Sequence, residues 1–168
     1  GINDDDYFGH SVSMSSNGDR IIIGSPGSDT FSPPAAGDEK GLAKIYEWDG
    51  ISWIQIGQNI LGEAANDWSG SSVSINSSGN IVAVSSPFAE CYRGQVRIFE
   101  LINSSWIQLG QIIQGDTCND VCGWSVSLNS AGNTIIVGSP EHDGNAGSLS
   151  GYTKSYNWNN SSWEQYGP

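Results

Sequence analysis

Three consecutive aspartates near the start of the chain, Asp4, Asp5 and Asp6, have the residue type and spacing of metal ligands. Carboxylate oxygens are the ligands that Ca²⁺ prefers, and one loop brings several of them together here. The loop has two relatives further along the chain. The three loops are GINDDDYFG at 1–9, GEAANDWSG at 62–70 and GDTCNDVCG at 115–123. The aspartate triplet is therefore the best candidate for a cation site, with Ca²⁺ as the first ion to consider.

Cation binding is one of three roles that would make these acidic loops recur, and the sequence does not decide among them. Asp and Asn near a glycine commonly form a local turn through their own side chains, so the recurrence could reflect turn geometry alone. The loops could also contact a protein or a glycan.

Two of the seven tryptophans, Trp68 and Trp124, lie in or beside these loops and are candidates for stacking on a sugar ring. Trp53, Trp106 and Trp163 instead recur at one position of a repeat, in SWIQIGQ, SWIQLGQ and SWEQYG. That recurrence indicates packing.

The three cysteines favour an oxidising compartment. Cys118 and Cys122 both lie in the third acidic loop, and we expect them to form a disulfide that staples it. Cys91 lies in the loop of the preceding repeat and is an alternative partner for either one. A C-x-x-x-C motif without a histidine or a second pair nearby is a poor zinc signature.

Glycosylation sequons occur at Asn76, Asn103, Asn159 and Asn160. All four fall at expected hairpin turns and would be accessible to a transferase in a secreted protein. Asn103 and one of the adjacent pair are the best candidates.

Catalytic motifs are missing from the sequence. It contains no Gly-x-Ser-x-Gly, His-Glu-x-x-His or phosphate-binding loop. Of the two histidines, His10 takes the place of Ser71 and Trp124 in the other repeats. His142 precedes Asp143, and the two could contribute to a metal site but are more typical of a surface pair. We therefore do not expect an enzyme.

The charge balance excludes further classes. Six basic against eighteen acidic residues give a net charge of −12 and a pI of about 4.1. A nucleic-acid binder needs basic residues against the phosphates, and an anionic membrane surface attracts basic segments. No apolar run reaches the roughly 18 residues of a membrane span, and the first residues do not resemble a signal peptide. We expect a processed mature chain or a piece of a longer one.

The elements that position these residues repeat three times. Each acidic loop is followed by a period-two run (HSVSMS, SSVSIN, WSVSLN), a turn, and an apolar run ending in Ser-Pro. Alternation with period two indicates a half-buried strand, and Asn17-Gly18 is the strongest hairpin signal. A loop and two further strands complete each unit. The serines in the first run suit a crowded innermost strand.

The sequence thus predicts an all-β fold of three tandem four-stranded antiparallel blades, as in a β-propeller. The repeats span residues 1–61, 62–114 and 115–168. The spacing between equivalent glycines is 61 and then 53 residues, from Gly9 to Gly70 to Gly123.

These motifs resemble the FG-GAP repeat of integrin α-subunit propellers. Phe8-Gly9 and Gly24-Ser25-Pro26 stand where the two name-giving motifs of that family stand, and Gly138-Ser139-Pro140 matches the second again. The likeness covers all three repeats and is closest to short variants in microbial and algal surface proteins. The family's calcium loops lie between the first two strands. Here those turns (SSNGD, NSSGN and NSAGN) hold too few carboxylates, so calcium is not carried over to them.

Propellers close with about four to eight blades, so three blades leave two sheet faces uncovered. Further blades of a longer chain, other copies of this chain, or stacking without closure would cover them. In a four-stranded meander the acidic loops share one end, which would be strongly negative. We expect a non-catalytic, extracellular structural or adhesive module of a larger assembly or filament. The alternative is a cation-dependent, lectin-like module that binds glycans or proteins through the acidic end.

Overall fold

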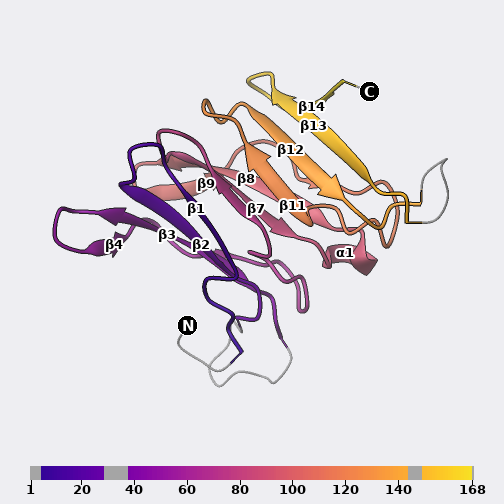
Figure 1. The fold of residues 1–168 in the computed structure, drawn as a ribbon, viewed down its shortest axis with the longest axis horizontal. Helices are drawn as coiled ribbons and strands as arrows, with labels where there is room; N and C mark the ends of the chain where they lie inside the picture. The colour runs from indigo at the N-terminus through magenta and orange to yellow at the C-terminus, as the bar shows by residue number, and fades with distance from the viewer. Residues whose placement is uncertain (1–4, 29–37, 144–148, 168) are drawn as a thin grey trace.

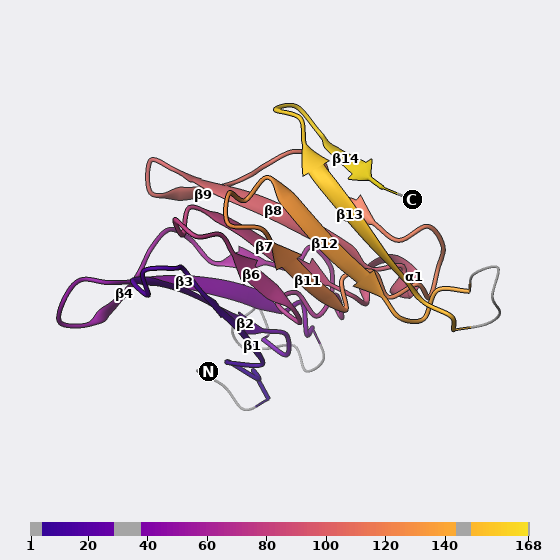
Figure 2. The ribbon, with the colours of Figure 1, turned by 45° about the horizontal axis from the view of Figure 1, so that its top comes forward.

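The computed structural model describes residues 5–28, 38–143 and 149–167, and it confirms the predicted all-β fold. Three antiparallel sheets lie side by side, with the N-terminal sheet at one end and the C-terminal sheet at the other (Figures 1 and 2). We call these sheets blades 1, 2 and 3 in chain order. In each blade four successive strands form a meander.

Blade 1 consists of β1 (Ser11–Met14), β2 (Arg20–Ser25), β3 (Leu42–Trp48), β4 (Trp53–Gln55) and β5 (Ile60–Leu61). Blade 2 consists of β6 (Val73–Ile75), β7 (Ile81–Ser86), β8 (Gln95–Ile102), β9 (Ser105–Gln108) and β10 (Ile113–Gln114). Blade 3 consists of β11 (Ser125–Leu128), β12 (Thr134–Ser139), β13 (Tyr152–Trp158) and β14 (Trp163–Tyr166). A four-residue helical segment, α1 (Ala89–Tyr92), joins β7 to β8. Within the described residues, no helix has the length and apolarity to cross a bilayer.

The outer edge of the first two blades is built from two short strands. Both β4 and β5 pair with β3, through Trp48 opposite Trp53 and Ala43 opposite Ile60. In blade 2, β9 and β10 pair with β8 in the same way. The backbone between the two short strands forms a corner, and a residue of the next blade packs against it.

The predicted hairpins form between the first two strands of each blade. Their turns place Gly18, Gly79 and Gly132 at φ of 78°, 72° and 77°, a conformation that glycine adopts without the steric penalty of a Cβ. The glycine in each turn therefore directs the chain back along the sheet.

Serines link the innermost strands of neighbouring blades. The Ser13 hydroxyl accepts a bond from the Ile75 N–H at 3.3 Å. Ser74 accepts one from Leu128 at 2.9 Å. These strands belong to different sheets, so only a small polar side chain can fit between them and still satisfy the backbone. The expectation of a crowded innermost strand is confirmed.

Each blade has two faces, and the core lies between blades. We call the face toward the preceding blade the front face and the face toward the following blade the rear face. The front face of blade 2 includes Val73, Ile75, Val82, Val84, Arg97, Phe99, Leu101 and Trp106. The rear face of blade 1 packs on it through Ile22, Ala43, Ile45 and Ile60. The equivalent residues form a second core between blades 2 and 3.

Candidate functional site

A buried aspartate organises the backbone of the second and third acidic loops. Asp67 Oδ2 accepts bonds from the N–H groups of Glu63 and Ala64 at 3.1 and 2.9 Å. Asp120 Oδ2 accepts the equivalent bonds at 2.7 and 2.9 Å. Asp6 occupies the same position of the first loop and is also buried. Local turn formation therefore accounts for the shared aspartate in the second and third loops.

The Asp120 carboxylate also takes part in a charged network. Burial opposes its ionisation. Hydrogen bonds from the Thr117 N–H and hydroxyl, from His142 and from the Asp116 N–H outweigh burial and hold the pKa of Asp120 below its ordinary value. His142 Nδ1 lies 2.9 Å from Asp120 Oδ1, and Lys154 Nζ lies 2.6 Å from both carboxylate oxygens of Asp116.

The candidate metal ligands divide into two groups. Asp4 lies outside the described residues, Asp5 is exposed, and the buried Asp6 has the position of a loop-organising residue. Asp116, Asp120 and His142 each offer a ligand atom within 4.8 Å of the others. Lys154 and the loop N–H groups already bond to the carboxylates of Asp116 and Asp120. A cation would have to displace these bonds.

The loops 62–70 and 115–123 each run along the preceding blade. The Asn66 and Ser69 N–H groups donate to the carbonyls of Asp38 and Lys40 at 2.9 Å. At the next junction, Asn119 and Cys122 donate to Cys91 and Arg93 at 3.2 and 3.0 Å. This ladder makes the loop 62–70 part of the first junction and the loop 115–123 part of the second.

The same ladder corrects the predicted disulfide. Cys118 bonds to Cys91, not to Cys122, and the two Cα atoms are 5.4 Å apart. The ladder draws Cys118 alongside Cys91. Cys122 instead packs into the core between blades 2 and 3, where it is 2% exposed. Burial raises the pKa of its thiol to about 11.

The two candidate stacking residues do come together. The Trp68 ring lies 5.2 Å from the Phe88 ring, and the Trp124 ring lies 6.5 Å from it, both edge to face. With His10 these side chains line a pocket of about 190 Å³. Trp68 Nε1 donates to the Glu39 carboxylate at 2.8 Å, which fixes its ring. Sequence reasoning missed Phe88, because the loop that carries it differs in each repeat.

The sequons differ in accessibility. Asn103, Asn159 and Asn160 are exposed at hairpin turns. Asn76 is 3% exposed, which contradicts its predicted accessibility. Its side chain lies within the β6–β7 turn, where its oxygen accepts the N–H of Asn80 and Ile81. Burial of the amide follows from this turn role.

The front face of blade 1 has no partner among the described residues. It carries Val12, Met14, Ile21, Ile23, Lys44, Tyr46, Trp48 and Trp53. Val12 and Met14 are 68% and 58% exposed, whereas the equivalent Val73 and Ile75 of blade 2 are 7% and 6% exposed. The same kind of surface is thus buried at the first junction and open to solvent on blade 1.

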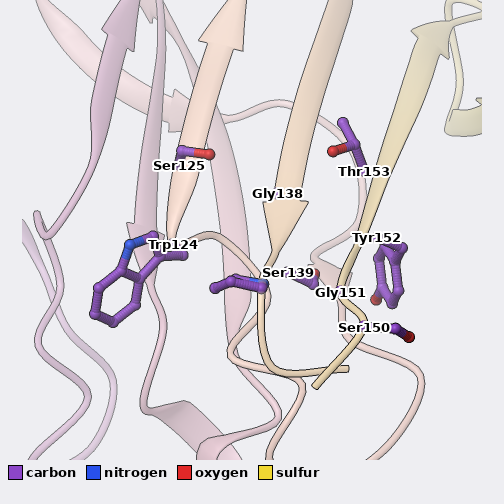
Figure 3. Close-up of a pocket in the computed structure, with 9 residues that line it drawn as sticks. Trp124, Ser125, Gly138, Ser139, Ser150, Gly151, Tyr152 and Thr153 are labelled. Carbon is purple, nitrogen blue, oxygen red and sulfur yellow. The ribbon is translucent and has the colours of Figure 1, made fainter. Parts of the chain in front are cut away.

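The rear face of blade 3 is more polar. It includes Ser125, Ser127, Ile136, Gly138, Thr153, Ser155 and the exposed Tyr166. Thr153 and Ser155 stand where blade 1 has Ala43 and Ile45. A pocket of about 450 Å³ opens on this face, with Ser125 and Thr153 on either side of Gly138 (Figure 3).

No protein-family profile and no curated protein match the sequence. Solved β-propeller structures match the fold. One is a protein of Bacteroides uniformis assigned as a 6-phosphogluconolactonase, with a TM-score of 0.60 and 13% identity over 94% of this chain and 40% of that one. TolB from Acinetobacter baumannii matches with a TM-score of 0.51 and 10% identity over 92% and 31% of the two chains. This chain therefore spans less than half the length of either, and at such identities the likeness concerns the fold alone. Its three sheets have the fold of part of a β-propeller.

Proposed function

We propose that this chain is a non-catalytic structural module of an extracellular assembly, built from repeats of the FG-GAP type and joined to its neighbours through uncovered blade faces. The observation that carries the proposal is the front face of blade 1. Its apolar side chains are of the kind that both internal junctions bury. Exposed apolar patches of this kind mark interaction surfaces.

Three further features support the proposal. The Cys91–Cys118 disulfide suits an oxidising compartment. Exposed sequons at Asn103 and Asn160 suit a secreted chain. His142 contacts the Asp120 carboxylate, which bonds the loop backbone. This contact suits a structural role for the histidine.

Site-specific photo-crosslinking tests this function in cells that secrete the protein. A benzoylphenylalanine at position 14 lies on the front face, and one at position 51 lies at the tip of the β3–β4 turn, where Ile51 is 87% exposed. We expect extracellular adducts from position 14 but not from position 51, and we expect them to persist in EDTA. Equal yields from the two positions, or loss of the adducts in EDTA, would contradict the structural role.

A second candidate function is the binding of a small glycan at the pocket lined by Trp68, Phe88 and Trp124. The convergence of two tryptophans on one apolar pocket favours it, since sugars stack on aromatic faces. Titration of tryptophan fluorescence with oligosaccharides tests it. Binding should weaken at least tenfold in Trp124→Ala and persist in Trp48→Ala, whose ring is 43% exposed outside the pocket. Equal affinity in the two variants would remove this candidate.

A further inference from the structure

We propose that the front face of blade 1 binds the rear face of blade 3 of a second copy of this chain, so that copies join head to tail. This inference rests on the proposed structural function and specifies the partner. The chain already makes the required contact twice, between its own blades. The front face of blade 1 and the rear face of blade 3 carry the two complementary surfaces of a third such contact.

The first half is a pocket on the rear face that receives a loop glycine from the next blade. At the first junction the Ser11 hydroxyl donates to the Gly70 carbonyl at 2.7 Å. A Cβ on Gly24 would collide with that same oxygen. Gly41 is covered in the same way, because an added Cβ would collide with the Ser69 carbonyl. The backbone of the acidic loop thus fills this position.

Blade 3 has the same pocket, but it is open. Ser125, Gly138 and Gly151 stand at the positions of Ser11, Gly24 and Gly41. Among the described residues, the three atoms nearest to a Cβ on Gly138 all belong to Ser125, a residue of its own blade. The 450 Å³ pocket in Figure 3 lies over these residues.

The second half is the loop Tyr7-Phe8-Gly9, which leads into the front face of blade 1. Its backbone has the conformation of the two loops that fill such pockets. Tyr7 and Gly9 have φ of 50° and 96°, against 55° and 90° for Trp68 and Gly70. An added Cβ on Gly9 would meet no atom of the described residues within 4 Å. The loop is therefore formed in the way that docking requires, with open space around its glycine.

At both internal junctions a tryptophan of one blade hydrogen-bonds the corner of the preceding blade. Trp106 Nε1 donates to the Ile56 carbonyl at 3.0 Å, and Gln58 bonds both the N–H and the carbonyl of Trp106. Trp163 bonds to Leu109 and Gln111 in the same way.

Blade 1 offers the tryptophan of such a contact, and blade 3 offers the corner. Trp53 is 39% exposed on the front face. At the rear, Tyr166-Gly167 matches the corner Ile56-Gly57, with Gly167 at φ 87° and Gly57 at 68°.

The composition of the rear face indicates a weaker contact than the internal ones. Thr153 has nearly the shape of the equivalent Val96, but a hydroxyl replaces one methyl group. The residue after Gly167 is proline, which cannot supply the two bonds that Gln58 makes. Interfaces between separately folded chains are more polar than a protein core.

Head-to-tail contact also pairs unlike surfaces. If two front faces met instead, both loops and both rear pockets would stay unused.

Sedimentation velocity over a concentration series tests the proposal with the purified chain. We expect the wild type to associate reversibly. Val12→Asp on the front face and Thr153→Arg on the rear face should each weaken association at least tenfold. Ile51→Asp, at an exposed site on neither face, should not. Ser125→Arg serves as a second rear variant, and unchanged circular dichroism checks that each variant folds.

Mixing the variants distinguishes the orientation. Because each variant keeps one intact face, an equimolar mixture of the Val12 and Thr153 variants should form a one-to-one complex of two chains. A rear variant that still associates, or a mixture that stays monomeric, would overturn the head-to-tail contact. A wild type that is monomeric at millimolar concentration, while position 14 crosslinks to another protein in cells, would overturn the second copy as partner. It would leave the structural function standing.

Discussion

Replacing the equivalent tryptophans of two blades by alanine measures how much the junction between blades contributes to stability. Trp106 is 2% exposed at the first junction, and Trp53 is 39% exposed on the uncovered face. This difference is about 90 Å² for a side chain that buries up to about 250 Å². At about 25 cal/mol per Å², that area corresponds to about 2 kcal/mol. Loss of the bond from Trp106 Nε1 to Ile56 adds about 1 kcal/mol.

We therefore expect Trp106→Ala to lower the free energy of unfolding by about 3 kcal/mol more than Trp53→Ala does. Urea denaturation followed by circular dichroism gives both values. The protein must be dilute enough to be monomeric, since docking of a second copy would cover Trp53. Trp163→Ala provides an internal replicate, because Trp163 is 3% exposed and makes the same bond to Leu109. Equal losses for Trp53 and Trp106 would refute the argument that these rings act between blades rather than within their own hairpins.

Four other outcomes follow from the loops and turns. Reducing the disulfide, which spans 27 residues, should cost about 3.5 kcal/mol in urea denaturation; before reduction, the buried Cys122 should react with a thiol reagent only once the chain is unfolded. Because the pKa of Asp120 is lower in the folded state, its stabilisation is full above the ordinary aspartate pKa and lost as the pH falls below it. Urea midpoints across about pH 5 to pH 2 should therefore fall less steeply in Asp120→Asn. In a eukaryotic secretory host, mass spectrometry should find glycan on Asn103 and none on the buried Asn76.

Much of the fold could be predicted because its determinants are local and repeat. Alternation in the runs beginning at Ser11 and Ser125 gives half-buried strands, and a glycine at each turn sets the hairpin. The small size of serine also predicted that the first strand of each blade lies close to the first strand of the next. Repetition made each inference stronger, since the same spacing had to work three times.

The candidate site could be predicted only in part. Trp68 and Trp124 were identified from their place near the acidic loops, but Phe88 between them lies in a segment without repeat signal. The sequence predicts Asp6 as a cation ligand because three carboxylates adjoin there. Asp6 is buried, and Asp67 at the same position of the second loop bonds the loop backbone, which composition does not reveal.

The sequence by itself determined the number of blades, their strand order and which residues alternate, because those depend on local propensity and periodicity. Only the tertiary structure decided which cysteines pair, which sequon is buried, and which blade face is covered. Each of these depends on where one loop lies against the next blade. Cys91 meets Cys118 through a ladder of backbone hydrogen bonds that joins segments 27 residues apart. Val12 and Val73 hold equivalent sequence positions, yet one is exposed and the other buried, because exposure depends on the neighbouring sheet and not on the residue.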